Sequence, residues 1–444
     1  IENLAVLTHA SGSTATVLGA INLDIQTGDL TINSGGSIDV EAAGYDYPSG
    51  SYADGNGPGG GGSNGSRGGG GGAYGGGGGI GQGGLAAGGS AYGSTTNPVQ
   101  LGSSGGSGNS GTAGAGGGLA IVSVAGTTTI NGVFNANGEI GDGGTFVTGG
   151  GSGGGINLTT GGLEGTGSVT ANGGAGQNNG GGSGGGGGGR IAITHTTGDS
   201  SALTLQAFGG LAPGSADEGA AGTIFTKSGS ETYGTLTTNN NDSEAAFSVT
   251  EVIGDVTFDT VVSASSSNLA VATGTTMSYT TLDIADGGIL TERGTINFPS
   301  SFTVESGGEV RLDRGRSFTN LTVNGTLSHS PNQSTQEYIL NITVTNDFTI
   351  NSGGSVDVSE AGYNLPYGSY ADGNGPGGGG SNGSRGGGGG AYGGDGGIGE
   401  TGLAVGGSAY GSTTNPVQLG SSGGSGNNST SGAGGGLAIF TVTG

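Results

Sequence analysis

The chain has 444 residues, of which 118 are glycine and none is cysteine, and its formal net charge is −24 from 32 acidic and 8 basic residues. Glycine at this density without a strict three-residue period excludes collagen and disfavours α-helix, and the lack of cysteine excludes disulfides and thiolate chemistry. The negative charge repels phosphate backbones and anionic lipid, and no apolar run is long enough for membrane insertion, so neither nucleic acid nor a membrane is expected as a partner.

Residues 1–43 are expected to form short β-coils. The segment LTINSGGSIDV (30–40) places alternating apolar residues before a glycine turn and a second short strand after it. Similar segments follow at 128–138, 282–292, 302–312 and 321–329. Gly288, Gly308 and Gly325 lie 20 and 17 residues apart, which suits the coils of a β-solenoid. Independent hairpins are the alternative that this spacing leaves open.

Residues 44–118 form a first glycine-rich block, and residues 349–444 contain a second copy of it with its preceding strand. The offset is 318 residues: Gly50–Gly76 is identical to Gly368–Gly394, and Gly88–Asn109 is identical to Gly406–Asn427. A long period with few differences indicates an array of copies, as in fibres and surface proteins. The two copies are therefore expected to adopt the same fold.

The blocks are expected to be ordered rather than flexible linkers. They keep their non-glycine residues over the full length of both copies, hold 10 of the 13 tyrosines, and each carry one arginine, Arg67 and Arg385. Extended polyglycine strands repeat every three residues, have no internal hydrogen bonds and can bond laterally to several neighbours. Polyglycine-II-like packing is the preferred interpretation, with tyrosines on the outer face; irregular ordered loops and disorder are the alternatives.

The segments between the blocks read as strands. Residues 119–196 combine strands with a second glycine-rich region, and residues 197–348 are expected to be β-solenoid. The fold class is thus all-β, with parallel β-helix or β-solenoid-like coils, polyglycine-II-like insertions and essentially no α-helix. Within the solenoid, RLDRGR is the nearest approach to a clustered active site, but alternation puts Arg311 and Asp313 on one strand face, where an ion-pair ladder explains them.

Calcium is the one cofactor that the sequence suggests. Asp54 and Asn56, repeated as Asp372 and Asn374, offer oxygen ligands on a turning backbone, as at the start of a calcium loop. The later glutamate of an EF-hand is missing, and an Asx-turn is the competing interpretation. His9 and His329 occupy matching contexts upstream of the copies and are expected at strand ends rather than on a metal.

The order LTVNGTLSHS, ITVTNDFTINSGGSVDVSEAGY, GNGPGGGG, GGGLAI, GTGSVTANGGAG and GGGGGGRIAI resembles a glycine-rich module of very large secreted bacterial proteins, over most of residues 1–196 and 317–444. Those proteins are generally taken for surface adhesins or matrix components, and the resemblance supplies no catalytic residues. The glycine blocks are also similar to the polyglycine-II sandwiches of some phage tail-tip adhesins.

These observations predict a non-enzymatic structural or adhesive repeat protein outside the cell, with its secretion signal outside this chain. Its expected partners are other copies of itself, with surface glycans as the alternative. A glycan- or ice-binding module ranks second, because regular threonine ladders would support ice binding and the Thr-rich stretches 127–129 and 235–238 are not regularly spaced. A β-helix carbohydrate-active enzyme ranks third, for want of a carboxylate cluster.

Overall fold

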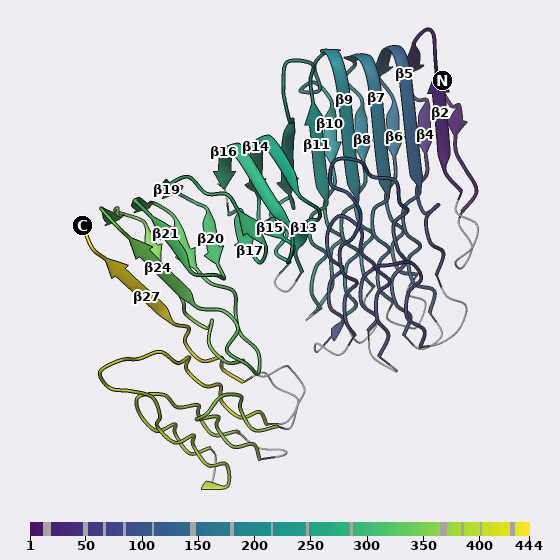
Figure 1. Cartoon of the computed structure of the whole chain (residues 1–444). Coiled ribbons are helices and arrows are strands. Elements are labelled where there is room, and N and C mark those ends of the chain that lie inside the picture. The colour runs from purple at the N-terminus through teal and green to yellow at the C-terminus, as the bar shows by residue number, and fades with distance from the viewer. Residues whose placement is uncertain are drawn as a thin grey trace. The chain divides into compact units, whose positions relative to one another are not determined.

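The chain folds into β-strands joined by turns and by extended glycine-rich runs, as the all-β prediction requires (Figure 1). The computed structural model describes residues 1–11, 19–47, 52–64, 68–82, 86–108, 111–142, 148–177, 182–214, 216–245, 248–284, 287–364, 371–382, 386–399, 402–426 and 431–444. It divides into two compact units: residues 1–289 with 294–297, and residues 290–293 with 298–444. The boundary lies inside the segment 197–348 that the sequence presents as one solenoid region.

The first unit contains a ten-stranded sheet in the order β18-β16-β14-β12-β11-β9-β7-β5-β2, with β3 also paired to β5. Its strands are β2 (Ile21–Ile25), β3 (Leu30–Ile32), β5 (Leu119–Ile130), β7 (Gly155–Glu164), β9 (Arg190–Gly198), β11 (Thr223–Lys227), β12 (Thr235–Asn239), β14 (Val256–Ala264), β16 (Thr276–Ile284) and β18 (Thr295–Ile296).

A second sheet of this unit has five strands in the order β1-β4-β6-β8-β10. They are β1 (Val6–Leu7), β4 (Ser37–Asp39), β6 (Val133–Asn135), β8 (Ser168–Thr170) and β10 (Thr204–Gln206). The strands β13 (Thr250–Val252) and β15 (Asn268–Val271) pair with one another in parallel.

Strand pairing is parallel from coil to coil, which favours the solenoid-like arrangement over independent hairpins. Leu119 of β5 lies opposite Gly155 of β7, and Gly155 lies opposite Arg190 of β9, so these coils are 36 and 35 residues long. Past β12 the coils shorten, and Thr260 of β14 lies opposite Thr281 of β16, 21 residues later. The longer coils contain the glycine-rich runs. The pair β11–β12 is antiparallel.

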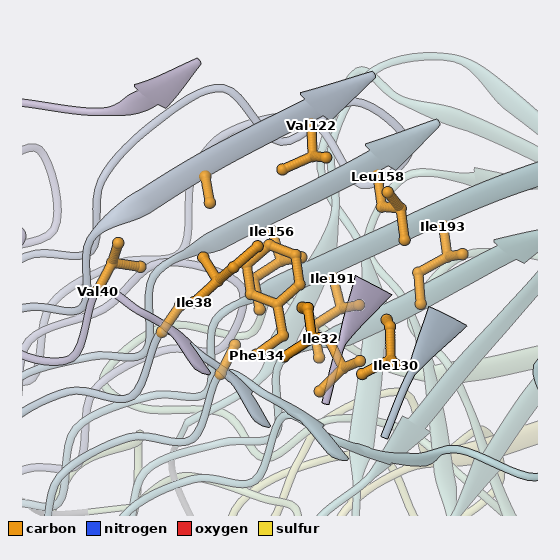
Figure 2. Close-up of a cluster of buried hydrophobic side chains, with 14 of the residues drawn as sticks. Ile32, Ile38, Val40, Val122, Ile130, Phe134, Ile156, Leu158, Ile191 and Ile193 are labelled. Atoms are coloured by element: carbon orange, nitrogen blue, oxygen red, sulfur yellow. The ribbon is translucent and has the colours of Figure 1, made fainter. Parts of the chain in front are cut away.

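The core of the first unit lies between its two larger sheets (Figure 2). Alternate residues of β5, such as Val122 and Ile130, and of β7, such as Leu158, meet Ile38 of β4 and Phe134 of β6, all of them buried. Because successive side chains of a strand point to opposite faces, each coil adds the same inward set to this core. Burial of aliphatic side chains therefore stabilises the strand layer.

The second unit carries three sheets. Their orders are β17-β20-β23-β26, β19-β22-β25 and β21-β24-β27. The strands are β17 (Ile289–Glu292, whose first residue belongs to the first unit), β19 (Ser301–Val304), β20 (Glu309–Leu312), β21 (Arg316–Phe318), β22 (Asn320–Val323), β23 (Thr326–Ser328), β24 (Leu340–Val344), β25 (Phe348–Ile350), β26 (Ser355–Val356) and β27 (Ala438–Val442).

The two copies of the repeat have corresponding strand pairs. In the first unit Ile21 of β2 lies opposite Ala120 of β5, 99 residues later. In the second unit Leu340 of β24 lies opposite Ala438 of β27, 98 residues later. Each of these long intervals contains one glycine block, so the block is an insertion at the same place in the coil.

Candidate functional site: the two glycine blocks

We call residues 44–118 the first block and residues 362–436 the second block. In the first block, the N–H groups of Gly70, Gly71 and Gly72 point to three different segments, with N···O distances of 2.8, 2.9 and 2.9 Å to the carbonyl oxygens of Gly62, Gly79 and Gly150. The three carbonyls in turn accept from the N–H groups of Gly106, Gly89 and Gly187. A strand of a β-sheet bonds to two neighbours only. These glycines therefore lie in a bundle with lateral bonds in three directions.

Close approach of backbones explains the glycine. A Cβ at Gly70 would lie 2.0 Å from the carbonyl oxygen of Ala87, and one at Gly71 would lie 1.9 Å from that of Gly185. A flexible linker has no such contacts. In the first block the glycines of 68–72 and 75–79 are buried, and hydrogen bonds between main chains hold segments together that offer almost no apolar side chains.

The second block repeats the hydrogen bonds of the first, as the sequence identity predicts. Gly388 donates to Gly380 O at 2.8 Å, as Gly70 does to Gly62 O at 2.8 Å. Further pairs that recur at the offset of 318 are Gly71–Gly79 as Gly389–Gly397, Gly89–Gly71 as Gly407–Gly389, Tyr92–Tyr74 as Tyr410–Tyr392 and Gly106–Gly70 as Gly424–Gly388. Arg67, Arg385 and Tyr370 lie outside the described residues.

The expectation that tyrosines cover the outside of the bundle is wrong for Tyr74, whose side chain is 0 % exposed. Its ring packs 4.9 Å from that of Tyr92, centroid to centroid, and burial raises its pKa to about 12. The expectation that Tyr392 has the same surroundings also fails. Tyr392 keeps the neighbouring ring, at 5.1 Å from Tyr410, but it is only half-buried and lacks the cation that covers Tyr74.

That cation is Arg190, the first residue of β9, which is 0 % exposed. Its Nε donates to Tyr92 O at 2.9 Å, its Nη2 donates to Glu251 O at 3.1 Å, and its guanidinium carbon lies 5.7 Å from the centroid of the Tyr74 ring. Nη1 donates to the hydroxyls of Thr95 and Thr223, both at 3.2 Å. Burial lowers the pKa of the guanidinium to about 10, so it stays charged at neutral pH. Arg190 thus connects the first block to three strands.

The four residues predicted for calcium make protein hydrogen bonds in both copies. Asp54 Oδ1 accepts from Ser63 N at 2.7 Å, and Asp372 Oδ1 accepts from Ser381 N at 2.7 Å. Asn56 Nδ2 donates to Asp46 O at 2.8 Å, and Asn374 Nδ2 donates to Asn364 O at 2.5 Å. Within the described residues, no group of three or more His, Asp or Glu side chains is placed to hold a metal. Since calcium also takes amide and carbonyl oxygens, its binding here stays a prediction.

The two matching histidines form the same contact in both copies. His329 Nδ1 lies 2.9 Å from Ser330 O, and its Nε2 accepts from Leu437 N at 3.2 Å. His9 does the same with Ala10 O at 2.8 Å and Leu119 N at 3.3 Å. A ring that donates through Nδ1 and accepts through Nε2 is neutral. Each imidazole therefore fixes the strand that leaves its glycine block.

We expect the second unit to lose stability as the pH falls below about 6.5, the ordinary value for histidine. Burial lowers the pKa of His329, and protonation would remove the Nε2 acceptor of Leu437 N. The unfolded chain then binds the proton at a higher pH than the folded chain, so stability is full above about 6.5 and declines toward the folded pKa. Urea unfolding between pH 5 and 8 measures this. His329→Gln should remove that part of the pH dependence, and equal slopes in both proteins would contradict the prediction.

The RLDRGR segment contains ion pairs other than the one predicted. Arg311 Nε lies 2.8 Å from Glu309 Oε1, and Arg316 Nε lies 2.8 Å from Oε2 of the buried Glu292. Asp313 is buried instead of joining a ladder with Arg311: its Oδ1 accepts from Ser330 N at 2.6 Å, and burial raises its pKa. The ladder of Arg311 with Asp313 is thus a wrong prediction, because Glu309 lies on the same strand face and takes the arginine.

Threonines do form a row across one sheet, which sequence spacing did not indicate. Thr226 of β11 lies opposite Thr235 of β12, Thr235 lies opposite Thr260 of β14, and Thr260 lies opposite Thr281 of β16. The coils differ in length, so the row is irregular in sequence and regular only in strand register. Thr281 is exposed and the others are partly exposed.

Comparison with known proteins gives no further guide: no family model matches the chain, and neither a curated protein nor a solved structure resembles it significantly. Among the described residues there is no helix of the length and apolar character needed to cross a bilayer.

Proposed function

We propose that this chain is a non-enzymatic structural or adhesive repeat protein of the cell exterior, built to associate with further copies of its own repeat. The observation that carries the proposal is the edge of β27. In the first unit the corresponding strand, β5, pairs with β2 on one side and with β7 on the other. β27 pairs with β24 on one side, and no strand among the described residues lies on its other side.

The free edge has the character of a pairing edge. The segment 437–442, LAIFTV, carries no charged residue, and Phe440 stacks on Phe348 of β25 at 4.7 Å between ring centroids. Natural sheet edges are usually protected by charges, prolines or bulges, and this one has none of these. An unprotected edge that repeats the sequence of an internal strand supports joining of one repeat to the next.

The glycine blocks support the same function. We infer that they are polyglycine-II-like layers, because three successive donors of one run reach three different neighbours. Such a layer derives its cohesion from backbone hydrogen bonds repeated along an array, and it requires no large apolar core. That suits a fibre or a surface layer, and the acidic, cysteine-free composition suits work outside the cell.

Removal of residues 437–444 tests the association. We expect the 444-residue chain to form oligomers or filaments as its concentration rises, and the shortened chain to remain smaller, because it lacks the β27 edge. Sedimentation velocity and electron microscopy provide the measurements. Hydrogen exchange of β21 and β22 provides the control that the shortened second unit is still folded. Monomers of the full chain at every concentration would contradict the proposal.

A binding module for glycan or ice is the second candidate, and the threonine row favours it. Thr235, Thr260 and Thr281 present hydroxyls at the spacing of adjacent strands, about 4.8 Å. Hydroxyls at this regular spacing suit an ordered array of hydroxyls or water as the ligand. A chain that stays monomeric in the sedimentation experiment would favour this candidate over the structural repeat.

A further inference from the structure

One face of the second block is open where the first block is covered. Positions 75, 76 and 79 of the first block correspond to positions 393, 394 and 397 of the second. A Cβ on Gly75, Gly76 or Gly79 would lie 2.2, 2.2 and 1.9 Å from the carbonyl oxygens of Gly189, Ala220 and Asp217. A Cβ on Gly393, Gly394 or Gly397 would meet nothing within 4 Å, and all three residues are exposed.

The backbone groups of this face are open as well. In the first block, Gly75 N and Gly76 N donate to Gly188 O at 3.0 and 2.9 Å, and Gly79 N donates to Gly185 O at 2.8 Å. In the second block, none of the described residues accepts a hydrogen bond from the N–H groups of Gly393, Gly394 or Gly397. The two blocks therefore differ in their neighbours and not in their internal fold.

The segments that cover the first block come from the coils that follow it. They are the glycine runs 148–154, 182–189 and 216–222, which lead into β7, β9 and β11. The second block has no counterpart of these runs in its own unit, and the absence leaves two side chains uncovered. Ile398 is 71 % exposed, whereas Ile80 is half-buried and its carbonyl accepts from Asp217 N at 2.8 Å. Tyr392 Oη is shielded from solvent and has no hydrogen-bond partner among the described residues.

One residue of the face differs between the copies, Asp395 in place of Gly77. Its side chain turns back on its own block, where Oδ1 accepts from Ala409 N at 2.6 Å. A Cβ at Gly77 would lie 3.3 Å from Val249 O, which a small shift accommodates. Asp395 therefore leaves the face accessible.

We propose that this open face of the second block is a docking surface for glycine runs with the sequences of 148–154, 182–189 and 216–222, presented by another repeat of the same sequence. The inference rests on the proposed function and names the surface and the segment that join. The first block supplies the argument for the occupant: its identical residues 68–76 bind those runs through hydrogen bonds and close packing. The docked repeat would place its own copy of Arg190 over Tyr392, as Arg190 lies over Tyr74.

An extended chain tests the docking without any need for filaments. In this variant a second copy of residues 125–239 follows Val442, which corresponds to Val124. Hydrogen exchange is measured at low concentration, where the variant is monomeric. We expect the amides of residues 390–397 to exchange about 100-fold more slowly or less in the extended chain than in the 444-residue chain, because opening of a buried hydrogen-bonded segment limits exchange.

The matched control is the double substitution Gly394→Ala with Gly397→Ala. In the 444-residue chain it should leave the unfolding midpoint unchanged, since both added methyl groups meet open space. In the extended chain it should abolish the protection, because the methyl groups would meet carbonyl oxygens of the docked runs.

Wild-type exchange rates at 390–397 in the extended chain would overturn the docking proposal, whether or not the added segment folds, because the face would have failed to order its intended occupant. Protection that instead rises with concentration in the 444-residue chain would show that the second block covers itself with its own copy, which also overturns it. Neither result depends on filament formation, so failure of the proposed function remains a separate outcome of the sedimentation experiment.

Discussion

Substitution of Arg190 by methionine should destabilise the first unit by about 3 to 5 kcal/mol, the range found when one partner of a buried charged network is removed. Methionine fills part of the volume and donates no hydrogen bond. The carbonyls of Tyr92 and Glu251 and the hydroxyl groups of Thr95 and Thr223 would lose their donor inside the protein. Each buried acceptor left unpaired costs about 1–3 kcal/mol.

Chemical unfolding followed by circular dichroism measures this loss, and hydrogen exchange shows where it acts. The first block and β9 should lose protection before the rest of the first unit. Arg190→Lys should be intermediate, because an ammonium keeps the charge but cannot reach four acceptors in the planar geometry of guanidinium. Arg311→Met is the matched control: Arg311 pairs with Glu309 near the surface, so a change of less than about 1 kcal/mol is expected. Equal effects of the two methionine variants would contradict a special role for Arg190.

The strand layer followed from the sequence to a large extent. Alternation in LTINSGGSIDV predicts two short strands around a glycine turn, and they are β3 and β4. The strands pair in parallel with the next coils, as a solenoid requires. The glycine count and the retained tyrosines predicted an ordered block, and the close contacts at Gly70 bear this out.

Arg190 was not predictable in the same way. In GGRIAI the alternating Ile191 and Ile193 indicate a strand, and a charged residue at its start reads as solvent-exposed. Its partners come from Tyr92, 98 residues earlier, and Glu251, 61 residues later, and no local pattern brings them together. Register explains the threonine row similarly, because coil length varies while strand pairing aligns Thr235 with Thr260.

The difference between the blocks also lies beyond local sequence. Identical residues impose the same internal hydrogen bonds, so Gly70 and Gly388 have matching contacts, with carbonyl oxygens 2.0 Å from an added Cβ in both cases. Whether Gly79 or Gly397 is covered depends on coils that follow one block and not the other. Sequence identity between copies therefore predicts fold and leaves environment open.

This difference makes a paired glycine substitution the sharpest test of the packing. Gly79→Ala would place a methyl group 1.9 Å from Asp217 O, against backbone that can move only if the bundle opens. We expect a loss of about 1–3 kcal/mol, the cost of an overpacked site. Gly397→Ala, at the same position of the second block, meets no atom within 4 Å, and it should be neutral or stabilise by about 0.4–1 kcal/mol through reduced freedom of the unfolded chain.

Two further variants separate packing within a block from packing between coils. Gly70→Ala and Gly388→Ala should both destabilise, because each meets a carbonyl of its own block, at Ala87 and Val405. Guanidinium unfolding of the four proteins, with hydrogen exchange to assign each transition to a unit, gives the comparison. If Gly79→Ala proves as harmless as Gly397→Ala while Gly70→Ala destabilises, the runs 182–189 and 216–222 do not press on the first block. The docking proposed for the second block would then lose its template, because the covered face of the first block is the physical reason to expect a partner on the open one.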